Sequence, residues 1–256
     1  MIIPKIVEQN FSKHPEDYNK IADTQREVAA KVAELIEDNC RTGEVLKILE
    51  IGCGTGFLSK EVMKRMPESD FLITDISPAM LEFCQTEIPA GISAKFAICD
   101  ITQGAPDGIF DVITSSLAFQ WVEDFEELIK DLHRHLTPEG ELIFTTLTEG
   151  TFANIATIFE ESDTLFPLPE MLSVEKLKQT VSCFENITLI EETYTEKYNS
   201  IKEFLDHIHK VGAGNATGEH LSISKLRQII KENRDSGEII AEYKVAFVVC
   251  RKKGKV

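Results

Sequence analysis

The sequence predicts an α/β fold in which a mostly parallel sheet carries helices on both faces. Short apolar runs alternate with amphipathic segments over residues 20–147, at a spacing of roughly 25 residues for each strand–helix unit. A glycine-rich turn follows the first apolar run, and aspartates end the next two. In such sheets the carboxyl ends of the strands share one edge, and ligands bind there.

The first 147 residues supply five of the predicted strands. Helical spacing of apolar residues predicts a helix over roughly 20–39, and the run 45–51 that follows is typical of a buried strand. A second strand at 71–76 leads into a helix with Ser77 as N-cap and Pro78 at its first position. Further strands are expected at 94–101, 108–117 and 141–147, with a helix near 125–136 and a turn at 137–140.

The last third of the chain follows a different pattern. Helical segments near 151–163, 173–183, 200–211 and 222–233 are separated by only two strand-like runs, at 185–198 and 239–250. We therefore expect these helices to be insertions between the last strands of the sheet. A single domain results, with an N-terminal segment and helix at 1–44, a ligand-binding core at 45–150, and the last strands with a helical lid at 151–256.

The net charge of −16 at pH 7 is unevenly distributed. The first 170 residues contain 13 Lys and Arg against 31 Asp and Glu, and the rest contain 14 against 12. The strongly acidic first 170 residues argue against a nucleic-acid partner, because phosphate binding needs clustered cations. No apolar stretch is long enough for a transmembrane helix, and the N-terminus has no secretory cleavage pattern. Six scattered cysteines without a CxxC pair indicate a cytoplasmic location and no zinc site.

The glycine-rich turn contains Gly52, Gly54 and Gly56 between a strand and a helix. Glycines let the backbone turn sharply and a ligand approach closely, and the positive end of the following helix faces that ligand. A dinucleotide fingerprint requires glycine at position 57, which is Phe57 here, so a dehydrogenase is disfavoured. The spacing is instead G-x-G-x-G, preceded by the acid Glu50.

Two aspartates end the second and third predicted strands. Asp75 stands 19 residues beyond Gly56, where a carboxylate can accept hydrogen bonds from ribose hydroxyls. Asp100 stands beside the apolar Ile101, and this pair can frame an adenine. The pattern predicts a nucleoside site at the carboxyl edge of the sheet.

These segments resemble those of the class I methyltransferases that use S-adenosylmethionine. The stretches LEIGCGTG, DISPAML, CDI and LTPEGELIF match that family's strand ends in order and spacing. The resemblance implies a Rossmann-like, seven-stranded, mostly parallel sheet with an antiparallel last strand and helical lid insertions. It implies S-adenosylmethionine as cofactor, S-adenosylhomocysteine as its product, and no metal.

The flanking segments narrow the resemblance to a carboxyl methyltransferase. The N-terminal segment has the form F-x6-Y-x6-QR, LAFQW follows the fourth strand, and GAGNAT lies in the late insertion. Together they are similar to the malonyl-acyl-carrier-protein O-methyltransferases of biotin synthesis. This implies methylation of the free carboxylate of malonyl held on acyl carrier protein, which gives the ester that starts pimeloyl synthesis. That carboxylate is already ionised at pH 7, so no general base is needed.

The resemblance also implies roles for individual residues. For the cofactor these are Glu50, Gly52, Cys53, Gly54 and Gly56 at the methionine part, Asp75 and Ile76 at the ribose, Asp100 and Ile101 at the adenine, and Ser115, Ser116 and Leu117 near the reacting methyl. Tyr18 is the catalytic candidate, expected to close over the sulfonium. The substrate candidates are Arg26, Gln120, Trp121, His207, His209 and Lys210. The two histidines are two residues apart and share no helix face, which argues against a metal pair.

Several alternatives stay open from the sequence alone. The substrate can be a small free carboxylic acid, of the trans-aconitate type, or another metabolite, and a non-catalytic cofactor-binding regulator is a further reading. The late run VGAGNATG follows a helix and lacks the lysine of a P-loop, so we expect it to form the hinge and wall of a lid. A helix cap followed by a functionless loop is the alternative. An acidic carrier is expected to dock where the basic positions Lys202, Lys210, Lys225, Arg227, Lys231 and Arg234 lie.

Overall fold

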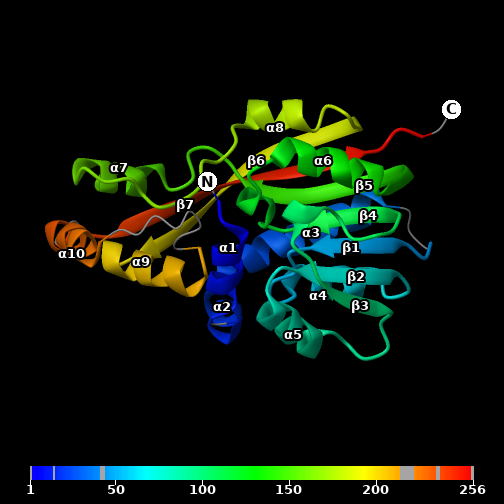
Figure 1. Ribbon diagram of the computed structural model, residues 1–256, viewed down its shortest axis with the longest axis horizontal. Coiled ribbons are helices and arrows are strands. Elements are labelled where there is room, and N and C mark those ends of the chain that lie inside the picture. Colours follow the sequence, from blue (N-terminus) through cyan, green and yellow to red (C-terminus); the bar gives the residue numbers. More distant parts are fainter. Residues whose placement is uncertain (1, 14, 41–43, 214–221, 235–236, 255–256) are drawn as a thin grey trace.

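A computed structural model describes residues 2–13, 15–40, 44–213, 222–234 and 237–254 of the chain. Its strands are β1 (Lys47–Ile51), β2 (Asp70–Asp75), β3 (Ala94–Ile98), β4 (Phe110–Ser115), β5 (Leu136–Leu147), β6 (Glu185–Tyr198) and β7 (Ile239–Arg251). They form one sheet in the order β3-β2-β1-β4-β5-β7-β6, and β7 alone runs antiparallel to its neighbours (Figure 1). The predicted seven-stranded sheet with an antiparallel last strand is confirmed.

The helices alternate with the strands through the first half of the chain and lie between the last strands in the second half. They are α1 (Pro4–Phe11), α2 (Pro15–Ile21), α3 (Asp23–Asn39), α4 (Phe57–Arg65), α5 (Pro78–Glu87), α6 (Phe125–Arg134), α7 (Ala153–Glu161), α8 (Val174–Thr180), α9 (Ile201–Lys210) and α10 (Ile223–Glu232), with short 3-10 turns η1 (Ile101–Gln103) and η2 (Phe119–Trp121). As expected, α9 and α10 are insertions between β6 and β7.

Two apolar clusters bury the two faces of the sheet. The buried side chains of α3, α4 and α5 belong to one cluster, and those of α6 and α8 belong to the other. Neighbouring residues of one strand reach opposite faces: Ile48 packs into the first cluster and Leu49 into the second. This is why the central strands are apolar runs without polar alternation.

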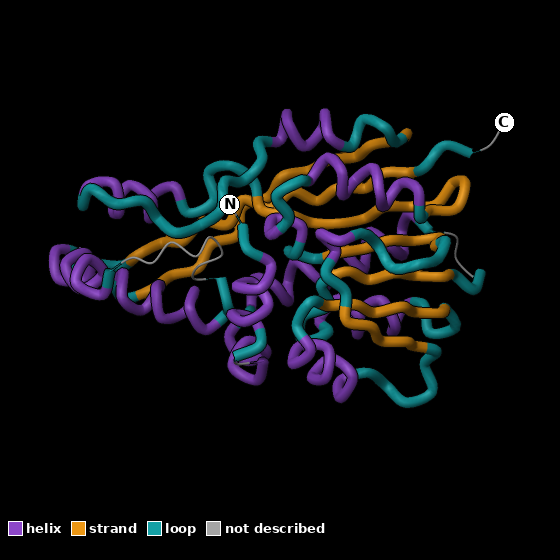
Figure 2. Tube along the Cα trace, viewed as in Figure 1, coloured by secondary structure: helices purple, strands orange, loops and turns teal. Residues whose placement is uncertain are grey.

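The strands β6 and β7 extend well beyond the parallel core, and α7, α9 and α10 gather around their far end (Figures 1 and 2). Helix α9 contacts both strands and also α2, so the late insertion meets the N-terminal helices. Gly212 ends α9 with a left-handed φ of 77°, as a glycine cap should, and a Cβ there would lie 2.9 Å from Phe11. Residues 214–218 of the predicted lid hinge lie outside the described residues.

Tyr18 precedes the helix that carries Gln25 and Arg26, and it lies within a separate short helix, α2, that the sequence did not predict. One local prediction was wrong. The segment 137–140, predicted as a turn, is part of β5 because it forms hydrogen bonds with the chain beyond β7. Glu139 donates its N–H to Lys252 O over 3.1 Å, and Lys252 N–H donates to Gly140 O over 2.8 Å. Glu139 has a left-handed φ of 66°. The extra residues appear instead as an irregular register between β4 and β5.

Candidate active site

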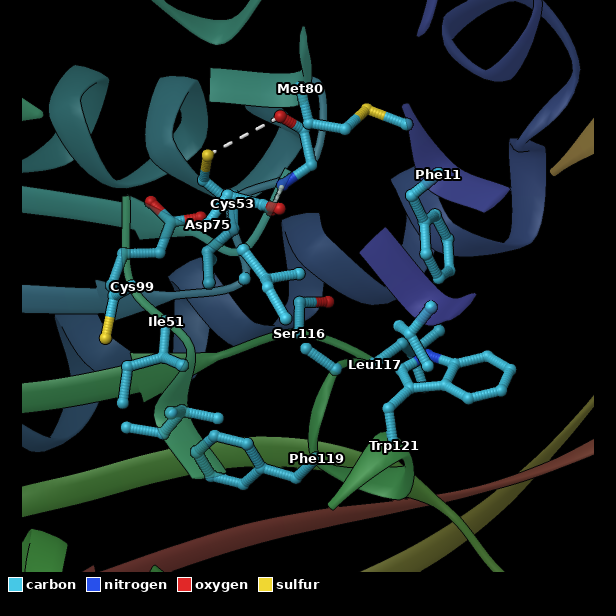
Figure 3. A pocket seen from close by; sticks show the side chains of 18 of the residues that line it. Phe11, Ile51, Cys53, Asp75, Met80, Cys99, Ser116, Leu117, Phe119 and Trp121 are labelled. Atoms are coloured by element: carbon cyan, nitrogen blue, oxygen red, sulfur yellow. Dashed lines mark hydrogen bonds between the residues drawn. The ribbon is translucent and has the colours of Figure 1, made fainter. Parts of the chain in front are cut away.

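An open pocket of about 970 Å³ lies at the carboxyl edge of the sheet, as predicted (Figure 3). Its floor comes from the segments that follow β1, β2, β3 and β4, and residues of α1, α2 and α3 close it from the other side. Asp75 and Cys99 lie at one end of the cavity, and Phe11 and Trp121 face each other at the other end. Of the predicted cofactor residues, the lining includes Glu50, Gly52, Cys53, Gly54, Asp75, Ile76, Asp100, Ile101, Ser116 and Leu117.

The glycine loop after β1 is braced by its own N–H groups. The N–H groups of Gly52 and Cys53 both donate to Thr74 O, over 2.9 and 3.0 Å, and Gly54 N–H donates to Asp75 Oδ2 over 2.8 Å. At φ 70°, a Cβ on Gly52 would lie 2.5 Å from the Cβ of Ala118. The loop therefore packs closely against the turn after β4, at a position where a side chain would clash. Gly56 does not line the pocket; a Cβ there would meet Cys84 Sγ at 2.8 Å.

Two buried carboxyl groups stand at the start of the pocket. Asp75 accepts N–H groups from Gly54 and Ser77, each over 2.8 Å, yet burial outweighs these bonds and raises its pKa to about 6. Glu50 accepts the Ser59 hydroxyl over 2.6 Å, and burial raises its pKa to about 7. A nearby positive charge would stabilise the ionised form of both carboxyl groups, and the amino group and sulfonium of S-adenosylmethionine would provide one.

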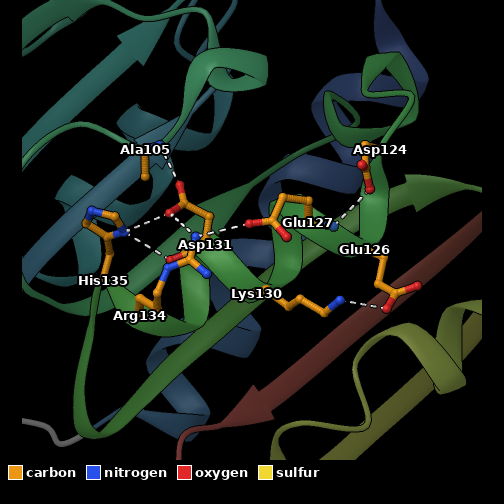
Figure 4. Close-up of polar contacts among 8 residues, drawn as sticks. All are labelled: Ala105, Asp124, Glu126, Glu127, Lys130, Asp131, Arg134 and His135. Atoms are coloured by element: carbon orange, nitrogen blue, oxygen red, sulfur yellow. Dashed lines mark hydrogen bonds and ion pairs between the residues drawn. The ribbon is translucent and has the colours of Figure 1, made fainter.

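The loop after β3 is held in place by helix α6. Asp100 caps the turn η1 by accepting Thr102 N–H over 3.0 Å and the Thr102 hydroxyl over 2.7 Å. Further along, Ala105 N–H donates to Asp131 Oδ2 of α6 over 2.7 Å (Figure 4). Asp131 also pairs with Arg134 at 2.9 Å. This network fixes the segment that is predicted to face the adenine.

The segment after β4 turns inward only at its second serine. Ser115 is buried and donates its hydroxyl to Ile51 O over 2.8 Å, so it ties β4 to β1 and does not line the pocket. Ser116 and Leu117 do line it. Leu117 has a φ of 50°, rare for a leucine, and its N–H donates to the Thr145 hydroxyl over 3.1 Å. That strained turn places Leu117 at the far end of the cavity.

Aromatic side chains form the wall at this far end. Phe11 meets Trp121 edge to face with ring centroids 5.7 Å apart, and it meets Tyr18 in the same manner at 6.4 Å. Tyr18 in turn stacks on Phe57 at 6.0 Å. Burial, and secondly the charge of Asp75, raise the Tyr18 pKa well above its ordinary value, so its phenol stays neutral. An electron-rich wall of this kind favours a cationic group.

A second, smaller pocket of about 510 Å³ adjoins the first. Five residues line both cavities: Phe11, Tyr18, Gln25, Leu117 and Trp121. The remaining walls are mainly apolar and come from β5, α7, α9 and β7 and the segments beside them: Gln120, Leu147, Phe152, Leu168, Met171, Ile208, Val211, Ala213 and Tyr243. The two cavities thus meet at a junction formed by residues of both the N-terminal helices and the turn after β4.

Four of the predicted substrate residues lie outside the lining of both cavities. Arg26 turns outward, where it pairs with Asp23 at 2.6 Å and lies over the Phe57 ring at 4.8 Å. His207 faces the carboxylate of Glu196, and the Lys210 side chain is exposed at the end of α9, as is that of His209. Gln120 and Trp121, in contrast, line the second cavity.

Sequence reasoning left several lining residues without a role. They include Val7, Gln25, Thr55, Met80, Cys99 and Phe119. A signal existed for one of them, because Phe11, Tyr18 and Gln25 recur at intervals of seven residues and all line both cavities. They do so from three different helices, so the spacing reflects the path of the chain and not one helix face.

The chain is similar to known methyltransferases. A family model described as "Methyltransferase domain" matches residues 49–144. "Malonyl-[acyl-carrier protein] O-methyltransferase 2" of Ilyobacter polytropus is 32% identical over 245 residues, which span 95% of this chain and 92% of that protein. "Malonyl-[acyl-carrier protein] O-methyltransferase" of Bacillus cytotoxicus is 27% identical over 269 residues, which span 100% of this chain and 94% of that protein.

Solved structures show the same fold. A putative methyltransferase from Bacillus halodurans aligns with a TM-score of 0.62 at 12% identity, over 87% of this chain and 98% of that one. The plantazolicin methyltransferase in complex with SAH aligns with a TM-score of 0.56 at 18% identity, over 98% and 95%. Within the described residues, no helix is long and apolar enough to cross a membrane. No group of three or more His, Cys, Asp or Glu that could hold a metal ion occurs in the described ranges.

Proposed function

The chain belongs to the malonyl-[acyl-carrier protein] O-methyltransferase family, and from this premise we propose that it methylates the free carboxylate of malonyl carried on acyl carrier protein, in biotin synthesis. The observation that supports this most is the junction between the two cavities. One cavity has the buried acids and glycine loop expected of a nucleoside site, and the other is a mainly apolar space suited to an acyl chain.

The residues of the larger cavity fit S-adenosylmethionine. Asp75 would hold the ribose, the Asp100–Thr102 segment the adenine, and the loop at Gly52–Gly54 the methionine part, with Glu50 bracing that loop. When bound, this cofactor supplies an electrophilic methyl group on a positively charged sulfur. The aromatic wall beside the junction would accommodate that positive charge, and we assign this role to Tyr18.

The chain's own contribution is alignment and exclusion of water. The carboxylate oxygen forms a bond to the methyl carbon while the carbon–sulfur bond breaks and its electron pair stays on sulfur; no proton moves. Holding the two reactants at one junction can lower the barrier by ~7–11 kcal/mol. Both opposite charges disappear in this step, so a dry, mainly apolar junction favours the transition state over the separated ions.

The carrier protein would approach the less acidic end of the molecule. On α10, Arg227 and Lys231 are exposed and stand four residues apart, on one face, with Lys225 partly exposed nearby. Helix α10 lies at the same end of the molecule as α9 (Figure 1), and Ile208 of α9 lines the second cavity. We place the carrier's docking face here because the rest of the chain is strongly acidic. The six cysteines are free thiols, which suits a reaction in the cytoplasm.

One assay separates this function from its alternatives. Purified protein is given a labelled methyl donor with malonyl-carrier protein, malonyl-CoA, free malonate or trans-aconitate in turn. We expect label transfer to be most efficient with malonyl-carrier protein, and the gene to restore growth of a biotin-requiring strain that lacks this methyltransferase. Faster transfer to a free acid would instead support a small-acid methyltransferase. Tight cofactor binding without turnover on any acid would support a regulator.

A further inference from the structure

The junction between the two cavities contains no positively charged side chain. None of the described residues that line either cavity is Lys, Arg or His. The nearest candidate by sequence, Arg26, is engaged outside: its two terminal nitrogens donate to Asp23 and to Asn19 O, each over 2.6 Å. Among the described residues, a carboxylate that reaches the junction therefore meets neutral donors and no cationic side chain.

Three of the five junction residues carry neutral donors: Gln25 an amide, Tyr18 a hydroxyl and Trp121 an indole N–H. Gln25 Oε1 is buried and has no hydrogen-bond partner among the described residues. A buried amide atom without a partner is costly, so a ligand at this position is expected to complete it. Because Oε1 is an acceptor, a carboxylate can pair with this amide only after the side-chain amide rotates by about 180°, which brings its N–H to the same position. The Tyr18 hydroxyl, from the neighbouring helix, donates to none of the described residues and stays protonated.

From this arrangement we propose that Gln25 orients the reacting carboxylate through its amide N–H, with the Tyr18 hydroxyl as a second donor. The proposal rests on the function proposed above and deepens it by naming the residues that hold the nucleophile. Phe11 and Leu117 complete the junction with apolar surface, and the indole N–H of Trp121 is a further neutral donor among the described residues that line both cavities.

A set of uncharged hydrogen-bond donors around the carboxylate, called the cradle below, suits this reaction better than an arginine side chain would. The carboxylate loses its charge as the ester forms, so an ion pair would stabilise the reactant more than the transition state and slow the step. Neutral donors orient the carboxylate oxygen and lower its nucleophilicity less than an ion pair would. Tyr18 on α2 and Gln25 on α3 line the same two cavities, so donors from two helices are available to orient a carboxylate there.

The first test compares Gln25→Ala with Gln25→Glu, with malonyl-carrier protein as substrate. Removing one hydrogen bond to a charged group should lower kcat/KM by about 10- to 100-fold in Gln25→Ala. The Glu variant has the same shape but adds a like charge, so it should lose more activity while its affinity for the cationic S-adenosylmethionine is kept or raised. Opposite changes for the two ligands are not expected of a purely structural residue.

Controls and a second donor make the outcome decisive. Gln179→Ala, an exposed glutamine on α8 outside both cavities, should match the wild type. Tyr18→Phe keeps the ring stack on Phe57 and should show a smaller loss, with non-additive coupling to Gln25→Ala. Unchanged kcat/KM in both Gln25 variants overturns the proposal, and so does a loss that is explained entirely by weaker cofactor binding.

The failure of the function and the failure of the cradle give different results. If the wild type does not methylate malonyl-carrier protein but methylates another acid, the proposed function is wrong, and the Gln25 variants are measured with that acid. If the wild type methylates malonyl-carrier protein and the Gln25 variants do so equally well, only the cradle is wrong. A neutral amide isostere, malonamyl-carrier protein, gives a readout without turnover: the wild type should bind malonyl and malonamyl forms with different affinities, and Gln25→Ala should reduce that difference.

Discussion

His207 Nε2 on α9 lies 3.5 Å from Glu196 Oε2 on β6. The Glu196 carboxylate also accepts hydrogen bonds from three hydroxyl groups. Thr24 at the start of α3 and Tyr198 of β6 donate to it, and Tyr243 of β7 donates over 3.3 Å. Glu196 thus links four elements, and Tyr243 is part of the wall of the second cavity. Glu196 therefore adds a polar anchor to the apolar packing of Ile201, Phe204 and Ile208 that holds α9 over that cavity.

Replacing Glu196 by Ala should loosen the second cavity and leave the first intact. Buried hydroxyls would lose their acceptor, so we expect the free energy of unfolding to fall by about 3 kcal/mol. The KM for malonyl-carrier protein should rise because the wall at Tyr243 and α9 shifts, while the affinity for S-adenosylmethionine stays nearly constant. Urea unfolding followed by circular dichroism, together with steady-state kinetics, measures both effects.

A matched control lies on the same strand. Glu192 binds Lys31 of α3 and accepts the Tyr194 hydroxyl over 3.1 Å, but its ion pair is partly exposed. Exposed pairs contribute about 0–1 kcal/mol, so Glu192→Ala should be nearly neutral. Equal losses in the two variants would show that Glu196 has no special part in holding α9.

Gly52→Ala should weaken cofactor binding. The new methyl group would stand 2.5 Å from the Ala118 Cβ and push the turn after β4 into the cavity. Overpacking of about 1–3 kcal/mol would weaken the affinity for S-adenosylmethionine by about 10- to 100-fold. Trp121, the only tryptophan of the chain, lines the cavity, so its fluorescence can report binding.

Gly91→Ala separates the clash from backbone strain. Gly91 also has a left-handed φ, of 93°, but a Cβ there would meet no atom within 4 Å. Both variants should lose some stability through strain, and only Gly52→Ala should lose cofactor affinity. If the two bind S-adenosylmethionine equally well, the close approach of Gly52 to Ala118 does not shape the site.

Local patterns in the sequence were sufficient to predict the sheet and the acids at its edge. Asp75 and Asp100 each follow an apolar run, and parallel strands must end at the same edge, so their shared location follows from chain order alone. The long strands β6 and β7 were predicted almost to the residue because their composition is unambiguous. The turn at 137–140 was missed because its partners lie over one hundred residues away, in the chain after β7.

The direction of individual side chains was not predictable in the same way. Ser115 and Ser116 are equivalent in sequence, yet the strand's alternation sends the first hydroxyl to Ile51 O and leaves the second at the cavity. Gln25 and Arg26 are likewise adjacent, and they face opposite ways on α3. Whether a side chain reaches the cavity depends on which face of its helix or strand the rest of the fold covers. The sequence of that helix or strand alone does not determine this.

Glu50→Gln should change how stability depends on pH. Burial raises the Glu50 pKa from its ordinary 4.5 to about 7, so the folded chain holds a proton that the unfolded chain releases. The stabilisation from this proton is complete below pH 4.5 and is lost as the pH rises toward 7 and above. Glutamine keeps an acceptor for Ser59 without that loss, so the variant should exceed the wild type at pH 8 by up to about 3 kcal/mol.

Urea unfolding at pH 5 and pH 8, without cofactor, measures this effect. We expect the two proteins to differ little at the lower pH and most at the higher pH. Glu82→Gln, an exposed glutamate of α5, serves as the control and should follow the wild type at both. Parallel pH profiles for wild type and Glu50→Gln would mean that Glu50 is not held in a buried, protonated state.

Charge reversal on α10 tests the docking face. Changing Lys225, Arg227 and Lys231 together to Glu should raise the KM for malonyl-carrier protein and leave the KM for malonyl-CoA unchanged, if the latter is a substrate at all. The rise should shrink as salt is added, because exposed charges are screened within about 10 Å at 0.1 M ionic strength. Reversal of Lys176, Lys178 and Lys253, which are exposed elsewhere on the chain, alters net charge equally and should have a smaller effect. If both triple variants raise the KM to the same extent, net charge and not α10 governs the encounter; if neither does, the carrier docks elsewhere.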